Sequence, residues 1–468
     1  MSDNSKRSRE RNELIERFEQ FLSANDPLFF EVEDFEEIIE HFLFGGELEK
    51  ALHACDVAIS QHPYSTEIII SKAQIFQNLK KYDQALELLD TAQTLHPTEV
   101  EVYLLKGSIL QDSGEIERAI DEYEKALPLS NEQDEVHYQI GLAYQNQENY
   151  DHAIEAYRKA IETNIQHEPA LFELTYCLDI TGRLGSSISY YKKFIDADPY
   201  SKVAWYNLGT VFDKLGKYEE AVDAYDYAIV IDDSFASAYF NMGNSYMNLK
   251  KYTKALDAYK KTIDSEGPSA EVYCCIGAAY ENLEQFALGT KYYQKATKLD
   301  NLYDEAWYGV GACLGFQDKW HQAVHFLNKA LKLDNHNAVY WLAVAEAEYK
   351  IGNVISSVDA YERASQLEPD NRKVWADWSF IYYEQGNHEQ AVNILSKGLE
   401  EFPDDADYFY RLTAYLIAAG RYKEAFNFLE NALILNFDNH TLLFDFFPQP
   451  ETQKALFKII DQFRKENS

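Results

Sequence analysis

The sequence predicts an all-α protein, an α-solenoid in which twelve helix–turn–helix units of 34 residues stack in a row. Three observations lead to this fold class. Small residues recur at fixed positions every 34 residues from residue 32 to residue 439, without an insertion. Apolar residues follow helical spacing in two stretches of each unit. Glycine often stands between these two stretches. One such hairpin cannot bury its apolar face alone, so neighbouring units must stabilise one another.

The unit is clearest over residues 202–235, where two short helices flank a turn at Gly216. Gly209 in the first helix and Ala221 in the second have almost no side chain, so the two helices can approach closely there. Tyr225 faces back from the second helix and fills the space beside them. A larger residue at the small positions would overpack the contact, at a cost of about 1–3 kcal/mol.

The same pattern extends along the chain. The eighth position of a unit is small everywhere except in the first unit, which carries Ile39. The twentieth position is small in every unit. The fifth unit departs most, with Thr175, Ser187 and Phe194 at three packing positions, so we expect a looser helix contact in the first and fifth units. The twelve units begin at Val32, Thr66, Val100, Asp134, Glu168, Lys202, Ala236, Ala270, Asp304, Ala338, Arg372 and Ala406.

Segments outside the repeats are expected to close the two ends. Residues 1–11 are polar and charged, and we predict a disordered tail there. Residues 12–31 are predicted to hold an N-terminal capping helix, followed by the twelve tandem units over residues 32–439. Residues 440–468 begin a thirteenth unit that prolines interrupt, and they are predicted to form a C-terminal capping segment and helix.

Composition excludes several classes of protein. The net charge of −35 argues against a nucleic-acid partner, because phosphates would be repelled. The five cysteines form no C-x-x-C pair and are expected to be reduced. The N-terminus carries no secretory signal, and no stretch approaches 18 apolar residues, so we expect a cytoplasmic protein without a membrane span.

No motif points to catalysis, a cofactor or a metal. The glycines of residues 309–315 resemble a phosphate loop only superficially, since they fall inside a predicted helix and at the wrong spacing. His321 and His325 share a helix face but lack an evident third ligand. Cys274 and Cys275 are adjacent in a helix and therefore point about 100° apart. The sequence thus predicts no catalytic residue, no cofactor and no metal ligand.

The pattern of small residues in the 34-residue unit resembles that of the tetratricopeptide repeat family, over about nine tenths of the chain. This resemblance implies a right-handed superhelix whose first helices line a concave groove. It further implies that positions 2, 5, 6, 9, 12 and 13 of each unit face the groove, and that the groove binds proteins or peptides. The basic clamp with which some family members hold a partner's C-terminal carboxylate is not reproduced in any unit.

The groove positions carry an excess of acidic residues. Across these 72 positions, 18 residues are acidic and four are basic. A concave surface with one sign of charge attracts the opposite sign, which favours a basic or amphipathic partner. The alternative is that glutamate at the second position merely complements the start of its helix. That alternative accounts for part of the excess only, because seven of the 18 acids stand at the second position.

Amides in the middle units and aromatic residues in the later units are the candidate contacts with a partner. Side-chain amides can bind an extended peptide backbone, whereas aromatic side chains suit an apolar anchor. The alternative for the aromatic residues is local packing. The candidates are Tyr206, Asn207, Phe240, Asn241, Asn244, Asn248, Tyr308, Glu346, Tyr349, Phe380, Tyr383 and Tyr410.

The sequence therefore predicts a scaffold or adaptor that binds peptide segments or partner proteins in an acidic, partly aromatic groove. A regulatory or targeting subunit of a separately encoded enzyme is an alternative. An enzyme is a third alternative, which the lack of a catalytic motif disfavours. Self-association through the tyrosine-rich surface is left open.

Overall fold

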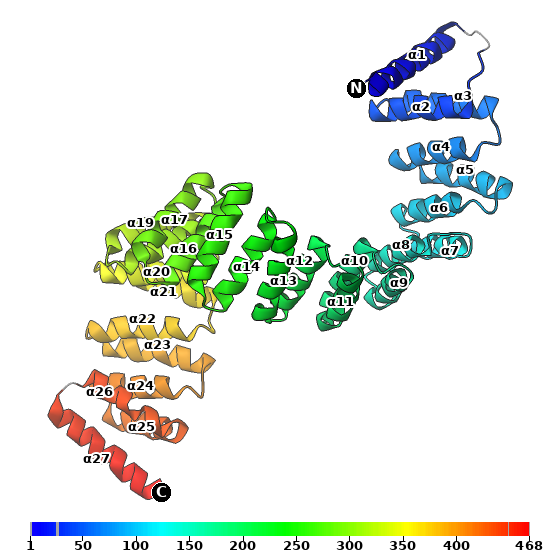
Figure 1. Ribbon diagram of the computed structural model, residues 1–468. Helices are drawn as coiled ribbons and strands as arrows, with labels where there is room; N and C mark the ends of the chain where they lie inside the picture. The colour runs from blue at the N-terminus through cyan, green and yellow to red at the C-terminus, as the bar shows by residue number, and fades with distance from the viewer. Residues whose placement is uncertain (1, 25–27, 448, 468) are drawn as a thin grey trace. The chain divides into compact units, whose positions relative to one another are not determined.

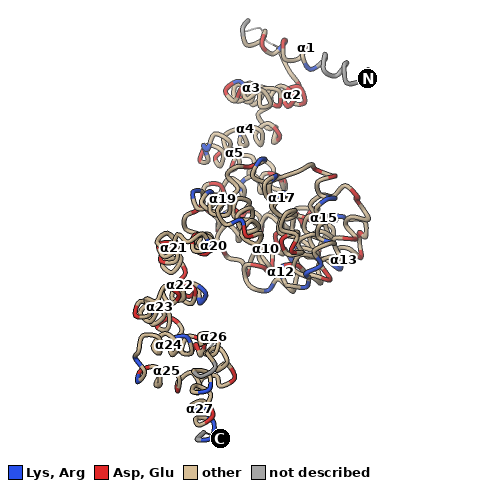
Figure 2. Tube along the Cα trace, turned by 90° about the vertical axis from the view of Figure 1, so that its left-hand side faces the viewer, with Lys and Arg blue, Asp and Glu red and all other residues tan. Residues whose placement is uncertain are grey.

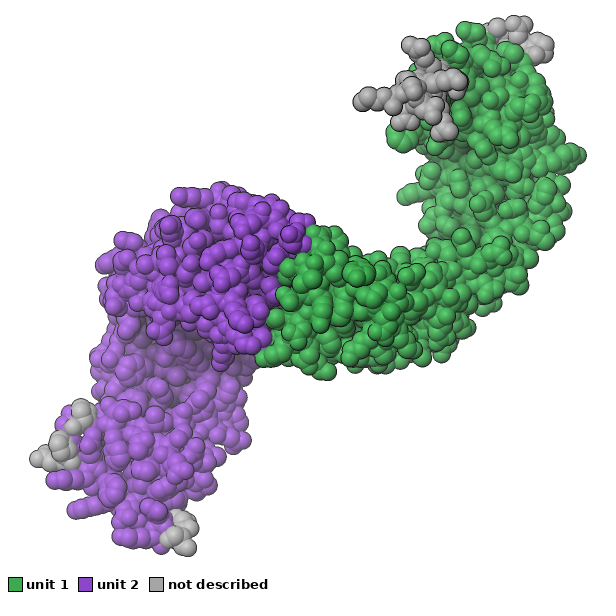
Figure 3. All heavy atoms as spheres, viewed as in Figure 1, with its two compact units in different colours: residues 1–232 green, residues 233–468 purple. Residues whose placement is uncertain are grey.

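A computed structural model of the protein describes residues 2–24, 28–447 and 449–467. Within these ranges the regular structure is helical throughout, with no strand. The α-helices follow one another as antiparallel pairs joined by short turns, as a solenoid of the predicted class requires (Figure 1). The chain divides into two compact units, residues 1–232 and 233–468, which are described separately below (Figure 3).

The first compact unit contains helices α1 to α13 and one 3₁₀ helix. Its elements are α1 (Ser2–Ala24), α2 (Val32–Phe44), α3 (Leu48–Gln61), α4 (Thr66–Asn78), α5 (Tyr82–Leu95), α6 (Val100–Asp112), α7 (Ile116–Ala126), α8 (Gln133–Asn146), α9 (Tyr150–Thr163), α10 (Glu168–Ile180), η1 (Leu184–Ser186), α11 (Ser187–Ala197), α12 (Lys202–Lys214) and α13 (Tyr218–Ile231).

The second compact unit contains helices α14 to α27 and another 3₁₀ helix. Its elements are α14 (Ala236–Asn248), α15 (Tyr252–Glu266), α16 (Ala270–Asn282), α17 (Phe286–Leu299), α18 (Asp304–Gly315), α19 (Trp320–Leu333), α20 (Ala338–Lys350), α21 (Val354–Leu367), α22 (Arg372–Glu384), α23 (His388–Glu401), α24 (Ala406–Ala418), α25 (Tyr422–Leu435), η2 (Phe437–Thr441), α26 (Leu442–Phe446) and α27 (Pro450–Asn467). In both compact units the first helices begin where the 34-residue pattern places them, except that α8 begins at Gln133, one residue early.

A glycine–tyrosine contact holds the two helices of many pairs together. In the α12–α13 pair, a Cβ added to Gly209 would lie 2.6 Å from Cε1 of Tyr225, a fully buried residue. The same contact joins Gly243 to Tyr259 and Gly277 to Tyr293. The tyrosine ring therefore occupies the space that the missing side chain leaves, as the sequence predicts for residues 202–235.

Pairs without the glycine contain residues of compensating size. The first pair combines Ile39 with Cys55, and both side chains are buried in one cluster. In the α10–α11 pair, Thr175 donates a hydrogen bond to the Tyr191 hydroxyl at 3.2 Å. The second helix of that pair starts with the 3₁₀ turn η1. The fifth unit of the sequence pattern is thus irregular at the start of its second helix, whereas its helix contact keeps a buried tyrosine.

The turn inside each pair needs one residue with positive φ. Glycine fills this place at Gly46, Gly114, Gly182, Gly216, Gly352, Gly386 and Gly420, with φ between 70° and 86°. Lys80, Glu148, Lys250, Glu284 and Asp318 fill the equivalent place in other pairs, with φ between 56° and 58°. A side chain is disfavoured in this conformation, so these five turns are less favourable than the glycine turns.

Helices flank the repeats at both ends. Helix α1 buries Phe18, whose ring lies 5.7 Å from that of Phe30 and 6.2 Å from that of Phe35. The structure starts α1 at Ser2, across the stretch that we expected to be a disordered tail. The lysine, arginine and glutamate residues of that stretch are good helix formers. Residues 25–27 of the expected N-terminal capping segment lie outside the described residues.

The C-terminal segment forms two helices after the last pair. Short helix α26 buries Leu443 and ends before Phe447, and Pro448, which was expected to break the helix, lies outside the described residues. Proline 450 is the first residue of α27 rather than a breaker of it, since proline fits the first turn of a helix. Leu456 and Ile460 of α27 are buried.

Candidate functional site

The second compact unit contains a cavity of about 390 Å³ among helices α16, α18, α19 and α20. Seven of its lining residues stand at positions that we expected to face a groove. They include two of the candidates, Tyr308 and Glu346. We call this cavity the acidic pocket, and its lining is Glu281, Tyr308, Gly311, Ala312, Gly315, Phe316, Asp318, Trp320, Ala323, Leu327, Ala343, Glu346 and Ala347.

Small residues of α18 make room for the acidic pocket. Gly311 packs against Leu327, and a Cβ on Gly315 would lie 2.9 Å from the Trp320 ring. Gly309 of the same helix packs against Tyr293. All three glycines therefore allow α18 to pack closely against α17 and α19. This packing agrees with the structural interpretation of the glycines at residues 309–315 over a phosphate loop.

Aromatic rings form one wall of the acidic pocket. The ring of Tyr308 stacks on that of Tyr340 at a centroid distance of 5.0 Å. Phe316 is 63% exposed and stacks on Phe286 at 4.7 Å. Trp320 is half-buried at the start of α19. These neighbouring rings hold the wall in place, so the pocket presents fixed aromatic faces.

Carboxylates from two different helix pairs complete the pocket. Glu281 of α16 accepts a hydrogen bond from the Tyr293 hydroxyl at 2.8 Å. Burial raises the pKa of Glu281 above its usual value, although that hydrogen bond and one from the Cys313 thiol oppose the rise. Burial also raises the pKa of Tyr308, with Glu281 and Glu346 adding to the effect. Carboxylates and aromatic rings therefore meet around one cavity.

Two lysines of the chain lie at the rim of the acidic pocket. The Nζ of Lys373 is 3.6 Å from a carboxylate oxygen of Glu346 and 3.3 Å from one of Asp377. The Nζ of Lys350 lies 6.0 Å from the centroid of the Trp320 ring. Both contacts are exposed to solvent, so each lysine can move without disturbing the core.

A second candidate surface lies on helices α22 and α24. Its residues are Phe380, Tyr383, Arg411 and Tyr415, and we call it the Phe446 site because Phe446 of α26 lies against all four. Candidates Phe380 and Tyr383 stack on each other at 6.1 Å. The structure thus brings them together, and the chain's own C-terminal segment covers them.

The candidates Tyr206, Asn207 and Phe240 of the middle pairs are partly buried. Tyr206 on α12 packs at 5.8 Å against Tyr225, and Phe240 on α14 packs at 5.8 Å against Tyr259. Asn207 on α12 lines a small cavity of about 120 Å³. These contacts agree with local packing for the rings at the fifth position.

The remaining amides of α14 differ in exposure. Asn244 accepts a hydrogen bond at 2.7 Å from the hydroxyl of Tyr259. Asn241 is half-buried, whereas Asn248 is exposed. Asn244 is therefore held by the core of its own helix pair, and Asn248 is the most accessible of the three.

Tyr410 does not lie on an accessible surface, which corrects its place among the candidates. Its side chain is fully buried, and its hydroxyl donates a hydrogen bond at 2.7 Å to the carbonyl oxygen of Asn436. The segment η2 that follows α25 covers it. Tyr349, in contrast, is half-buried and donates a hydrogen bond to Glu384, and burial together with that carboxylate raises its pKa to about 12.

Sequence reasoning left out several residues of these two surfaces, among them Trp320, Tyr415, Arg411 and Phe446. Trp320 stands at a helix start and not at a groove position. The feature of the sequence that could have indicated its place is Gly315, whose missing side chain leaves space for the Trp320 ring. Arg411 was counted only as a basic groove residue. Phe446 belongs to the interrupted thirteenth unit, and no feature of the sequence shows that the ring reaches back to α22.

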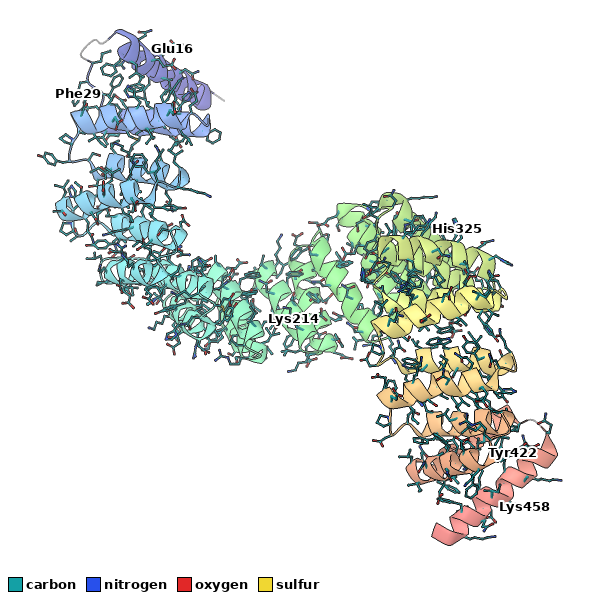
Figure 4. All side chains as sticks on the ribbon, turned by 180° about the vertical axis from the view of Figure 1, so that it is seen from behind. Glu16, Phe29, Lys214, His325, Tyr422 and Lys458 are labelled. Atoms are coloured by element: carbon teal, nitrogen blue, oxygen red, sulfur yellow. The ribbon has the colours of Figure 1, made fainter. Side chains whose placement is uncertain are left out.

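Metal binding finds no support in the described part of the chain. No group of three or more His, Cys, Asp or Glu side chains that could hold a metal ion occurs there. His321 and His325 are exposed on α19, where Figure 4 labels His325. All five cysteines are free, and burial raises the pKa of Cys275 to about 11. No helix in the described ranges is long and apolar enough to cross a membrane.

Family models match several stretches of the chain. A model described as TPR repeat matches residues 107–148 and 209–250. Models described as tetratricopeptide repeat match residues 135–166, 190–223, 236–265, 270–301 and 356–414. No curated protein matches the chain.

Solved structures of similar fold share little sequence with the chain. One is described as YrrB, a TPR protein with an unusual peptide-binding site, at 22% identity and a TM-score of 0.34, over 39% of this chain and 95% of that one. The APC/C hetero-tetramer Cut9–Hcn1 matches at 15% identity and a TM-score of 0.39, over 85% and 96%. MamA from Desulfovibrio magneticus RS-1 matches at 21% and 0.34, over 35% and 93%.

Proposed function

The chain is a tetratricopeptide repeat protein, and from this premise we propose that it is a scaffold that holds a basic segment of a partner protein in the acidic pocket. Proteins of this family generally act as protein–protein interaction scaffolds and are typically not enzymes. The groove chemistry that we propose for this member concerns the acidic pocket of the second compact unit.

The observation that carries the proposal is the meeting of carboxylates and aromatic faces around one cavity. Glu281 and Glu346 come from α16 and α20, and Tyr308, Phe316 and Trp320 line the space between them. A guanidinium can pair with a carboxylate and stack on an aromatic face at the same time. An arginine or lysine side chain of a partner is therefore the best match to this lining.

The chain's own lysines support this choice of ligand. Lys373 pairs with Glu346, and Lys350 lies over Trp320. Each half of the proposed recognition, the carboxylate pair and the cation over an aromatic ring, thus already occurs at the rim with an internal cation. A partner's cation would compete with these lysines for the same carboxylate and the same aromatic face.

The net charge of the whole protein favours the same partner. Acidic residues outnumber basic ones by 78 to 43, and both compact units carry them along the trace (Figure 2). Such a field attracts a basic segment from a distance and speeds its arrival. The acidic pocket would then fix the position of the bound segment.

A binding experiment with defined peptides tests the proposal. The probes are a labelled decapeptide of alternating arginine and alanine, and a counterpart with glutamine at each arginine position. We expect the arginine peptide alone to bind, and its affinity to fall between about 50 and about 300 mM NaCl. Tyr308→Ala and Glu346→Gln should each weaken binding by about fivefold or more, since each removes one contact to the cation.

The matched control is Glu362→Gln, which removes an exposed carboxylate of α21 outside the acidic pocket. This control separates pocket recognition from attraction to the net charge. Equal binding of the arginine peptide by the wild-type chain, Tyr308→Ala and Glu346→Gln would contradict the proposal, because general attraction would then account for all of the binding.

A further inference from the structure

The C-terminal segment places an aromatic side chain on the inner helices of the last pairs. The ring of Phe446 meets that of Tyr383 edge-on at 5.3 Å and that of Tyr415 edge-on at 5.8 Å. It also lies 6.3 Å from the ring of Phe380. Three rings from the two first helices α22 and α24 thus surround one ring of α26.

Polar contacts fix the same segment. The hydroxyl of Tyr383 donates a hydrogen bond at 3.4 Å to the carbonyl oxygen of Phe446. The guanidinium carbon of Arg411 lies 5.9 Å from the centroid of the Phe446 ring, so a cation faces the ring. These are the kinds of contact with which a groove holds a bound helix.

Phe446 differs from its neighbours in its degree of burial. Leu443 is fully buried and Phe447 nearly so, and both belong to the core of the last pairs. Phe446 is only half-buried, and it borders a cavity of about 510 Å³ lined by Asp377, Glu384 and Arg411 among others. Leu443 and Phe447 therefore anchor the segment, whereas the ring of Phe446 can leave its place without opening the core.

Two of the residues under Phe446 stand at positions that the 34-residue pattern does not reserve for small packing residues. Phe380 and Tyr383 occupy the ninth and twelfth positions of their unit, which we expected to face a groove. We propose that Phe446 is an intramolecular ligand of the Phe446 site, and that this site binds a helical partner segment with an aromatic anchor in its place. This site is separate from the acidic pocket and takes an aromatic rather than a cationic side chain.

Tethering makes Phe446 a strong competitor. A short link keeps the ring at an effective concentration in the millimolar range, so a partner at micromolar concentration meets an occupied site. The apparent affinity of the partner falls by the fraction of molecules in which the site is free. The segment would thus admit partners that bind tightly and exclude weak ones.

A peptide added in trans tests this inference on the full chain. The probe is a labelled peptide with the sequence of residues 437–450. We expect it to bind the Phe446→Ala chain at least tenfold more tightly than the wild-type chain. A peptide that itself carries alanine at the position of Phe446 should not bind. Adding Tyr383→Ala to Phe446→Ala should abolish the gain.

The matched control is Phe457→Ala, which removes a 57% exposed ring of α27 and should bind the peptide as weakly as the wild-type chain does. Equal peptide affinity of Phe446→Ala and wild type, with helicity and melting temperature retained, would overturn the inference.

Hydrogen exchange on the wild-type chain gives a second test that does not depend on a variant. An excess of the peptide should speed exchange of the Phe446 amide, because the ring then leaves the site, whereas the amides of the anchoring residues Leu443 and Phe447 should stay protected. Unchanged exchange at saturating peptide would overturn the inference, as would a wild-type dimer that exchanges these segments between two copies.

Discussion

At the scale of single residues, buried tyrosines have two roles in this protein. Their rings fill the space above glycines of the facing helix, and their hydroxyls hold polar groups of the first helices. Tyr225 donates to Asp213 at 2.7 Å, and Tyr157 donates to Gln145 at 2.7 Å. Tyr293 does the same with Glu281. Some polar residues at groove positions are therefore fixed in orientation by the core beneath them.

The glycine–tyrosine contact predicts a specific pattern of stability. Gly209→Ala should lower the free energy of unfolding by about 1–3 kcal/mol, because its Cβ would collide with the Tyr225 ring. Adding Tyr225→Leu should recover part of that loss, since the α4–α5 pair combines Ala73 with Leu89, both fully buried. Chemical denaturation of the two single variants and the double variant measures the coupling.

The control for this prediction is Gly185→Ala. None of the described atoms lies within 4 Å of a Cβ built on Gly185, so this variant should be as stable as the wild type or more so. A loss equal to that of Gly209→Ala would show that the effect comes from the backbone and not from the tyrosine ring.

Glu281 predicts a dependence of stability on pH. Its pKa in the folded chain is raised by burial, so the folded state binds more protons than the unfolded state between the ordinary pKa, 4.5, and the raised value. Stability from this group is therefore lost as pH rises through that window. Glu281→Gln removes the effect, so the variant should gain stability relative to the wild type as the pH rises above 4.5.

Denaturation midpoints at several pH values measure this difference. The exposed Glu362→Gln variant is the control, and it should keep a constant offset from the wild type. A Glu281→Gln variant whose offset is equally constant would show that burial does not disfavour the charge at this site.

At the scale of elements, the turns inside the pairs differ in conformational energy, because some have glycine at the positive-φ position and others have a residue with a side chain. Glutamate 284 adopts a φ of 58° between α16 and α17, where other pairs use glycine. Glu284→Gly should raise the free energy of unfolding by about 1 kcal/mol, because it removes the crowding between Cβ and backbone. Thermal or chemical unfolding measures the gain.

The neighbouring residue provides a matched control. Gln285 is also exposed but has a φ of −90°, so Gln285→Gly should give no gain and a small loss of stability. Stabilisation of the same size in both variants would contradict the assignment of strain to Glu284.

The sequence was sufficient for the helices but only partly so for the candidate site. Small residues every 34 positions predict the starts of the first helices, since the period repeats one hairpin. The burial of Tyr410 could not be predicted, because its hydroxyl donates to the carbonyl oxygen of Asn436, a contact that the pattern of small residues does not encode. Trp320 and Phe446 were missed for a related reason: what each ring contacts is decided by local departures from the repeat, not by the repeat.

At the scale of the whole molecule, charge is the dominant property. A net charge of −35 makes the folded chain repel itself, and salt screens that repulsion. The melting temperature should therefore rise between about 20 and about 300 mM NaCl, whereas binding of a basic segment should weaken over the same range. Calorimetry of the free chain checks the first effect, and a fall in melting temperature would contradict it.

On our proposals, the acidic pocket and the Phe446 site are two recognition surfaces of different chemistry in the second compact unit. One offers carboxylates beside aromatic faces, and the other offers aromatic faces beside an arginine. A scaffold with both surfaces could bind a basic segment in the acidic pocket at any time. At the Phe446 site it could bind an aromatic segment only after the ring of Phe446 has left.

A crystal structure of the full chain with a bound arginine-containing peptide tests the central claim most directly. We predict an arginine side chain of the peptide inside the acidic pocket, with its guanidinium near Glu346 and against the ring of Tyr308. A peptide bound on the second helices of the pairs, with the acidic pocket filled by water alone, would contradict it.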